Sequence, residues 1–235
     1  MTFSADETRR YARHLVLKGI GGPGQQKLKA ARVLVVGAGG LGSPAIAYLA
    51  AAGVGTLGIV DHDTIAVSNL QRQIVHTTSG IGETKAASAG AFVSALNPHV
   101  TVEPHAQKFS AELPAGYDIV LDGTDLAETR TAIAEATAAA GRPLVAGAVF
   151  MFDGQLTVFM PEPDMPKYRD LYPTMPAAED TPSCEAVGVL GAVTGVIGTL
   201  MAMEAIKLIT GVGEPLIRRL MLYDGKAARF SEVAY

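Results

Sequence analysis

The chain has 235 residues, of which 49% are hydrophobic, and a formal net charge of -4. This length and apolar content suffice for one large α/β domain or two small ones. The acidic balance gives no support for a nucleic-acid partner or an anionic-membrane partner. The single cysteine, Cys184, excludes an intrachain disulfide and is typical of a protein kept in the reducing cytoplasm.

The first residues carry mixed charges and no apolar core, so we expect no signal peptide. Ser4 and Glu7 have capping-box spacing, which predicts an N-terminal helix over residues 4–18. Arg13 lies on this amphipathic helix beside apolar positions. An exposed surface arginine is its ordinary interpretation.

A glycine-rich turn follows a short apolar run that predicts a buried strand over residues 32–36. The turn reads GAGGLGSP from Gly37 to Pro44 and leads into a predicted helix over residues 41–52. Glycines at such a turn let phosphates approach the backbone, and the helix N-terminus offers free N–H groups to an anion. The residues concerned are Gly37, Gly39, Gly40 and Gly42. The next predicted strand, residues 56–61, ends in Asp61, where a carboxylate would accept hydrogen bonds from ribose hydroxyls.

Strands and helices alternate through the first two-thirds of the chain, which is typical of a parallel sheet wrapped by helices. Further strands are predicted over residues 100–105, 117–122 and 144–149, and further helices over residues 83–96, 126–140 and 189–210. An antiparallel strand is predicted over residues 154–160. The predicted fold is therefore α/β and Rossmann-like, with a mostly parallel sheet, flanking helices and a C-terminal antiparallel extension.

We interpret residues 1–235 as a single domain. Its parts are the N-terminal helix 4–18, a nucleotide-binding core 30–150, a long crossover loop 161–185, and a C-terminal helix and strands 186–235. Two uncharged stretches, residues 33–60 and 186–203, resemble membrane spans in composition. Glycines interrupt both, so we interpret them as soluble core and expect no membrane partner.

Cationic and polar residues follow the strand that ends in Asp61. The segment SNLQRQ contains Ser68, Asn69, Arg72 and Gln73, and Lys85 comes soon afterwards. Phosphate chemistry needs such cations, whereas the hydride-transfer site of a dehydrogenase, the rival interpretation, does not. A solvated helix lysine is the alternative interpretation of Lys85.

The chain resembles the MoeB/ThiF/HesA family, the bacterial relatives of ubiquitin-activating enzymes, nearly from end to end. The matching segments are RYARHLVL at 10–17, GAGGLGSP, VDHD at 60–63, SNLQRQ, Lys85, GTD at 123–125 and PSCEAVGVLG at 182–191. The resemblance implies a homodimer that uses ATP and Mg²⁺ to adenylate the C-terminal glycine of a ubiquitin-like sulfur carrier with a Gly-Gly terminus. That route leads to molybdopterin or thiamine.

The resemblance also implies roles for individual residues. Arg72 and Lys85 would contact the phosphates, Asp125 would hold Mg²⁺, and Arg13 would reach the partner subunit's ATP. Asp63 would orient the loop before Asn69, and Ser68, Asn69 and Gln73 would lie in the nucleotide site. Asp122 is the alternative, structural carboxylate of its pair, and His62 and His76 have the character of structural residues. The crossover loop would help to receive the carrier's tail.

The sequence departs from the family pattern at several positions. Leu126 and Ala134 stand where asparagines are usual. Both CxxC pairs of the family's structural zinc site are missing, so we expect no zinc. Cys184 matches a cysteine that some relatives link to the carrier, and an inert packed thiol is the equally weighted alternative. Other functions left open are adenylation of a small-molecule or tRNA-attached carboxylate and an inactive nucleotide-binding scaffold.

Overall fold

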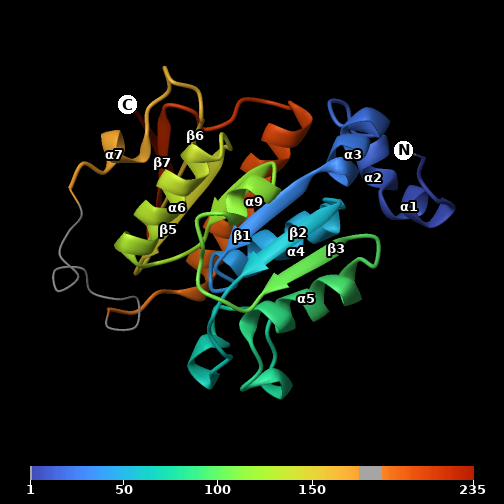
Figure 1. Ribbon diagram of the computed structural model, residues 1–235, viewed down its shortest axis with the longest axis horizontal. Coiled ribbons are helices and arrows are strands. Elements are labelled where there is room, and N and C mark those ends of the chain that lie inside the picture. Colours follow the sequence, from blue (N-terminus) through green and yellow to red (C-terminus); the bar gives the residue numbers. More distant parts are fainter. Residues whose placement is uncertain (1, 175–186) are drawn as a thin grey trace.

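One eight-stranded sheet forms the centre of the computed structural model, which describes residues 2–174 and 187–235 (Figure 1). The strand order is β3-β2-β1-β4-β5-β6-β7-β8. The first five strands of the chain pair in parallel, and β5 to β8 pair antiparallel. The strands are β1 Arg32–Val36, β2 Thr56–Val60, β3 Thr101–His105, β4 Ile119–Asp122, β5 Leu144–Phe150, β6 Asp153–Phe159, β7 Arg219–Asp224 and β8 Arg229–Ala234. The predicted fold class is thereby confirmed.

Helices cover both faces of the sheet. The α-helices are α1 Ala5–Arg10, α2 Ala12–Leu15, α3 Gly21–Ala30, α4 Gly42–Ala52, α5 Lys85–Leu96, α6 Ala127–Ala139, α7 Tyr168–Leu171 and α9 Gly191–Thr210. The 3₁₀-helices are η1 Val67–Asn69, η2 Thr78–Gly80 and η3 Leu113–Gly116. Alternate residues of β1 point to opposite faces, so that Val33 and Val35 pack with α4, α5 and α9, and Leu34 and Val36 pack with α6.

Helix α9 is a core helix, and its glycines let it approach its neighbours closely. A Cβ atom at Gly198 would lie 2.3 Å from the carbonyl oxygen of Leu41, and one at Gly191 would lie 2.4 Å from that of Gln71. The helix is long and apolar enough to cross a membrane by composition. Its buried Ile197 and Met201 pack against the sheet instead, at Gly147 and Gly154. The apolar composition of α9 is therefore explained by core packing.

The continuous N-terminal helix predicted over residues 4–18 is wrong. The capping box at Ser4 and Glu7 forms as expected, but the helix breaks at Tyr11 into α1 and α2. The buried Tyr11 ring fills the space above Gly53, and its hydroxyl accepts a hydrogen bond from Asn97 at 2.9 Å. This anchoring of Tyr11 accounts for the break.

Two further helices lie where none was predicted. Helix α3 follows α2 and contains glycines and a proline, which hide its helical character in the sequence. Helix α7 forms a single turn inside the predicted loop 161–185, where Lys167 N–H donates to the Asp170 carboxylate at 2.7 Å. The ring centroids of Tyr168 and Phe159 lie 5.6 Å apart, and this contact packs α7 against strand β6.

Candidate functional site

The glycine turn lies at the carboxyl edge of the parallel strands, between β1 and α4. Gly37 has a φ of +94°, a backbone conformation that favours glycine. A Cβ atom at Gly42 would lie 1.8 Å from the carbonyl oxygen of Gly37, so the turn cannot close with a larger residue there. A Cβ atom at Gly40 would lie 3.0 Å from the Thr194 side chain. Packing within the chain therefore explains these three glycines.

Gly39 differs, because packing does not require it. Its φ is not positive, and the nearest atom to an added Cβ would be Gln73 Nε2 at 3.6 Å. Two buried polar atoms near the turn, Ser43 Oγ and Gln73 Oε1, have no hydrogen-bond partner among the residues that the structure describes. The start of α4 has no side-chain cap at Leu41. Gly39 and these groups are therefore the candidate contacts for a phosphate-bearing ligand.

Both backbone groups of Ala38, inside the turn, are held by side chains from other elements. The N–H donates to Asp61 Oδ2 at 2.8 Å, and the carbonyl accepts from His76 Nε2 at 2.9 Å. The second Asp61 oxygen accepts from Asp63 N–H at 2.9 Å. His76 Nδ1 lies 3.0 Å from Ser88 Oγ on α5. Asp61 therefore supports the turn itself, and His76 is structural, as its sequence context indicates.

Lys85, the first residue of α5, is paired with Asp63. Its Nζ donates to Asp63 Oδ2 at 2.8 Å, and its N–H donates to the Asp63 carbonyl at 2.9 Å. The Lys85 hydrogen bond lowers the pKa of the Asp63 carboxyl. Lys85 is 6% exposed, which excludes the solvated helix lysine considered from sequence. A phosphate at this edge would compete with Asp63 for the ammonium.

The segment SNLQRQ packs against the glycine turn. It comprises the end of η1 and the residues that follow it. Asn69 is buried, and its Oδ1 accepts from Ala66 N–H at 3.0 Å, while its carbonyl accepts from Arg72 N–H and Gln73 N–H. Arg72 is half-buried with its stem over Gly40, and its Nη1 donates to the carbonyl of the exposed Ser68 at 3.1 Å. No other described residue accepts from its guanidinium, so most of the Arg72 donors are available to a ligand.

The two carboxylates at the end of β4 and in the loop that follows it have different surroundings. Asp122 is fully buried, and its Oδ1 accepts from Thr124 N–H at 2.9 Å and Thr124 Oγ1 at 2.7 Å. Asp125 is exposed, and within the described ranges no hydrogen bond or ion pair engages its carboxylate. Gly123 lies beside Gly37, which brings this loop to the glycine turn. Asp122 has the structural position, and Asp125 is free to bind a cation.

Sequence reasoning missed Arg130, whose guanidinium Nε lies 3.6 Å from Asp122 Oδ2. Arg130 is 8% exposed and is the one basic residue of α6. An isolated arginine in an alanine-rich helix just after two aspartates is the signal that could have found it.

Two candidate residues stand apart from this group. Arg13 lies on α2, and the N-terminal helices lie at the amino edge of the sheet, opposite the glycine turn (Figure 1). The exposed Arg13 is therefore not brought together with Arg72 or Asp125 of its own chain. Cys184 lies outside the described residues.

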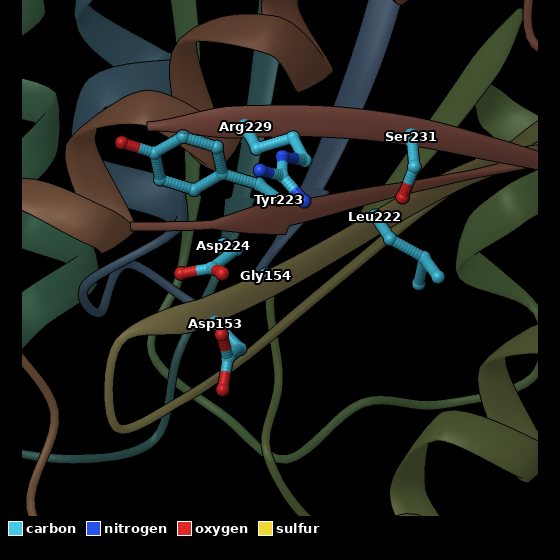
Figure 2. Close-up of a pocket in the computed structure, with 7 residues that line it drawn as sticks. All are labelled: Asp153, Gly154, Leu222, Tyr223, Asp224, Arg229 and Ser231. Carbon is cyan, nitrogen blue, oxygen red and sulfur yellow. The ribbon is translucent and has the colours of Figure 1, made fainter. Parts of the chain in front are cut away.

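A surface hollow of about 340 Å³ lies on β6, β7 and β8 (Figure 2). Asp153, Asp224 and Arg229 line it, at the sheet edge that also carries the glycine turn. None of the candidate residues that the structure describes lines this hollow, so we do not place a nucleotide there. The nucleotide site is instead indicated by the open face of Gly39 and its neighbours.

Alanine at Gly39 and alanine at Gly42 are expected to have opposite effects. Gly42→Ala would force a methyl group onto the Gly37 carbonyl and reduce the free energy of unfolding by about 3 kcal/mol, the upper end of ordinary overpacking costs. Gly39→Ala would leave stability almost unchanged and weaken ATP binding. Urea unfolding and titration calorimetry with ATP measure the two effects. Normal ATP binding by Gly39→Ala would contradict the site.

His76 is expected to make the protein less stable below neutral pH. Burial lowers the pKa of His76, although the Ala38 hydrogen bond opposes this, so the folded chain takes up the proton at a lower pH than the unfolded chain. Stability is therefore lost as pH falls below the ordinary histidine value of about 6.5, by at most about 1.4 kcal/mol per pH unit. Urea unfolding at pH 7.5 and 5.5 should show a smaller loss in His76→Gln than in the parent protein. An equal loss in both would contradict this assignment.

The ThiF family matches this chain over residues 11–235. A probable adenylyltransferase/sulfurtransferase MoeZ of Mycobacterium tuberculosis is 48% identical, over 94% of this chain and 58% of the relative. The SAMP-activating enzyme E1 of Haloferax volcanii is 46% identical, over 100% of this chain and 88% of the relative. The sulfur carrier protein adenylyltransferase of Thermus thermophilus is 43% identical, over 99% of this chain and 89% of the relative. The chain thus spans little more than half the length of MoeZ.

Solved structures share the fold at lower sequence identity. The crystal structure of PaaA matches with a TM-score of 0.85 at 20% identity, covering 99% of this chain and 74% of that one. The crystal structure of Escherichia coli MccB with ATP matches with a TM-score of 0.80 at 20% identity, covering 96% of this chain and 71% of that one. These similarities concern the sheet and its helices.

Proposed function

The chain belongs to the ThiF family, and from this premise we propose that it is an ATP-dependent adenylyltransferase. Its substrate would be the C-terminal glycine carboxylate of a ubiquitin-like sulfur carrier with a Gly-Gly terminus. The observation that carries the proposal is one sheet edge that combines the open Gly39 face with Arg72, Lys85 and the exposed Asp125 carboxylate. Relatives named as sulfur carrier and SAMP-activating enzymes support the substrate class.

The reaction joins a carboxylate oxygen of the carrier to the α-phosphorus of ATP and releases pyrophosphate. A C-terminal carboxyl, with an ordinary pKa of about 3.5, is ionised at neutral pH and needs no general base. Its repulsion from the phosphates must be removed instead. Arg72 would contact a phosphate through its free guanidinium donors, and Lys85 would move from Asp63 toward the nucleotide.

Asp125 would hold Mg²⁺, since an exposed carboxylate that no other described residue engages suits a cation that prefers oxygen ligands. Bound there, Mg²⁺ would neutralise phosphate charge. No zinc is proposed, because a thiolate site cannot be assembled from one cysteine. The adenylation step uses no thiol nucleophile, so Cys184 is either an inert thiol or acts only in a later step of sulfur transfer.

We further propose a cytoplasmic homodimer that acts in molybdopterin or thiamine biosynthesis, with neither nucleic acid nor membrane as a partner. The acidic chain supports the last two points. The dimer is supported by the resemblance, which assigns Arg13 to the partner subunit's ATP, and the position of Arg13 far from the glycine turn of its own chain agrees with that role.

ATP-pyrophosphate exchange tests the function directly. We expect exchange when a carrier ending in Gly-Gly is added, and none with the same carrier lacking its last glycine. Exchange supported by a small carboxylic acid without a carrier would favour a small-molecule substrate. ATP binding without exchange under any condition would favour a nucleotide-binding scaffold.

A further inference from the structure

A buried ion pair contacts the loop that carries Asp125. Asp122 at the end of β4 is fully buried and Arg130 on α6 is 8% exposed, with Arg130 Nε at 3.6 Å from Asp122 Oδ2. Burying two charges costs more free energy than an ordinary surface pair returns, so the pair is weak evidence for a stabilising role. Its position, rather than its contribution to stability, requires an explanation.

The two charged groups hold Thr124 between them. Asp122 Oδ1 accepts from the Thr124 N–H at 2.9 Å and from its hydroxyl at 2.7 Å. Arg130 Nη1 donates to the Thr124 carbonyl at 3.3 Å. The N–H and the carbonyl of Thr124 are thus each held by a charged side chain, and Asp125 is the next residue. Hydrogen bonds to charged groups are stronger than neutral ones, so this contact restrains the loop effectively.

We propose that Arg130 is a positioning residue for Asp125, which acts by holding Thr124 against the buried Asp122 carboxylate. Asp125 itself has no partner in the described parts of the chain that could hold it in place. A cation-binding carboxylate needs a fixed position to bind well, and Thr124 supplies it from the adjacent residue. The inference rests on the proposed function only in taking Mg²⁺ and ATP as the ligands.

The test compares Arg130→Lys with Arg32→Lys. Lysine keeps the charge beside Asp122 but lacks the forked donors that reach Thr124. Arg32 forms the matched control, because its guanidinium pairs with Glu103 at 2.8 Å at the amino edge of β1, away from the Asp125 loop. Each substitution is also made in an Asp125→Asn background, so that a double-mutant cycle shows whether Arg130 acts through Asp125.

Two readouts are measured: amide hydrogen exchange of residues 123–126, and calorimetric binding of ATP at a series of Mg²⁺ concentrations. We expect Arg130→Lys to speed exchange in this loop about tenfold and to raise the Mg²⁺ requirement about tenfold, the scale of one lost charge-assisted hydrogen bond. Arg32→Lys should change neither. In the Asp125→Asn background, Arg130→Lys should no longer alter the Mg²⁺ requirement.

The proposal is overturned if the loop keeps its protection in Arg130→Lys. It is also overturned if Mg²⁺-dependent binding falls equally with Asp125 present and absent, because Arg130 would then be merely structural. Neither readout uses the carrier or the exchange reaction. A failure of carrier activation would therefore contradict the proposed function and leave this test able to decide on Arg130.

Discussion

Replacing Arg72 or Asp125 with alanine is expected to reduce carrier-dependent pyrophosphate exchange by about 100- to 1,000-fold. Arg72→Ala loses a cation that compensates the phosphates in the transition state, and Asp125→Ala loses the carboxylate proposed to hold the Mg²⁺ that does so. One such group contributes roughly 3 to 4 kcal/mol in a site arranged to stabilise developing charge. The rate constant at saturating substrate should fall as well as the apparent affinity, because the carboxylate and the phosphates repel each other most as they approach.

Folding stability should change little in either variant. Arg72 makes one side-chain hydrogen bond, to the Ser68 carbonyl, and Asp125 is exposed without a partner in the described part of the chain. Exposed and half-exposed substitutions of this kind change stability by about 0.5 kcal/mol. A large loss of activity with an almost unchanged urea midpoint is therefore the expected result for both.

Arg32→Ala and Asp118→Ala are the matched controls. These residues have the same types and meet at the opposite edge of β1, where Arg32 N–H donates to Asp118 Oδ2 at 2.8 Å. They should lower stability more than the test variants do and leave exchange per folded molecule unchanged. Near-normal exchange by folded Arg72→Ala or Asp125→Ala would remove that residue from the catalytic site.

The sheet and the glycine turn could be predicted from sequence because their signals are local. The β-branched run before Gly37 and the length of the alternating segments define β1 and β2 to within one residue. Arg72 and Asp125 were expected at this edge because each comes soon after a predicted strand, and open α/β sheets bind ligands there. The role expected for Lys85 came from the family resemblance.

The remaining features depend on contacts between distant residues. Tyr11 breaks the N-terminal helix because it packs on Gly53 and Asn97, which are far along the chain. Arg130 was missed because its role depends on burial against Asp122, which a helical pattern cannot show. The pairing of Lys85 with Asp63 was missed for the same reason. Sequence indicated which side chains gather at the edge, and packing determines which of them are engaged or free.

Arg13 is expected to act on the ATP bound to the other subunit. Within one chain, α2 lies at the amino edge of the sheet (Figure 1), whereas Arg72 packs on Gly40 and Asp125 follows β4 at the carboxyl edge. A rigid eight-stranded sheet separates these edges, so a side chain cannot connect them. In a twofold symmetric dimer, each subunit can supply its Arg13 to its partner's site. Arg13→Ala alone should therefore be nearly inactive in exchange although its own nucleotide edge is intact.

Mixed dimers test this arrangement by counting sites. Arg13→Ala and Asp125→Ala proteins, each inactive alone, are co-refolded so that half of the dimers contain one of each. One site in each mixed dimer then combines an intact Asp125 with the partner subunit's intact Arg13, and the other site carries both lesions. Recovery of roughly one quarter of the parent activity is expected from one working site in half the dimers.

The control mixture combines Arg72→Ala with Asp125→Ala, two lesions that the structure places at the same edge of one chain. Neither site of that mixed dimer is complete, so no activity should return. Recovery in the first mixture and none in the second would locate Arg13 in trans, with Arg72 and Asp125 in cis. If both mixtures stay inactive although mixed dimers are present, the arginine acts within its own chain or has only a structural role.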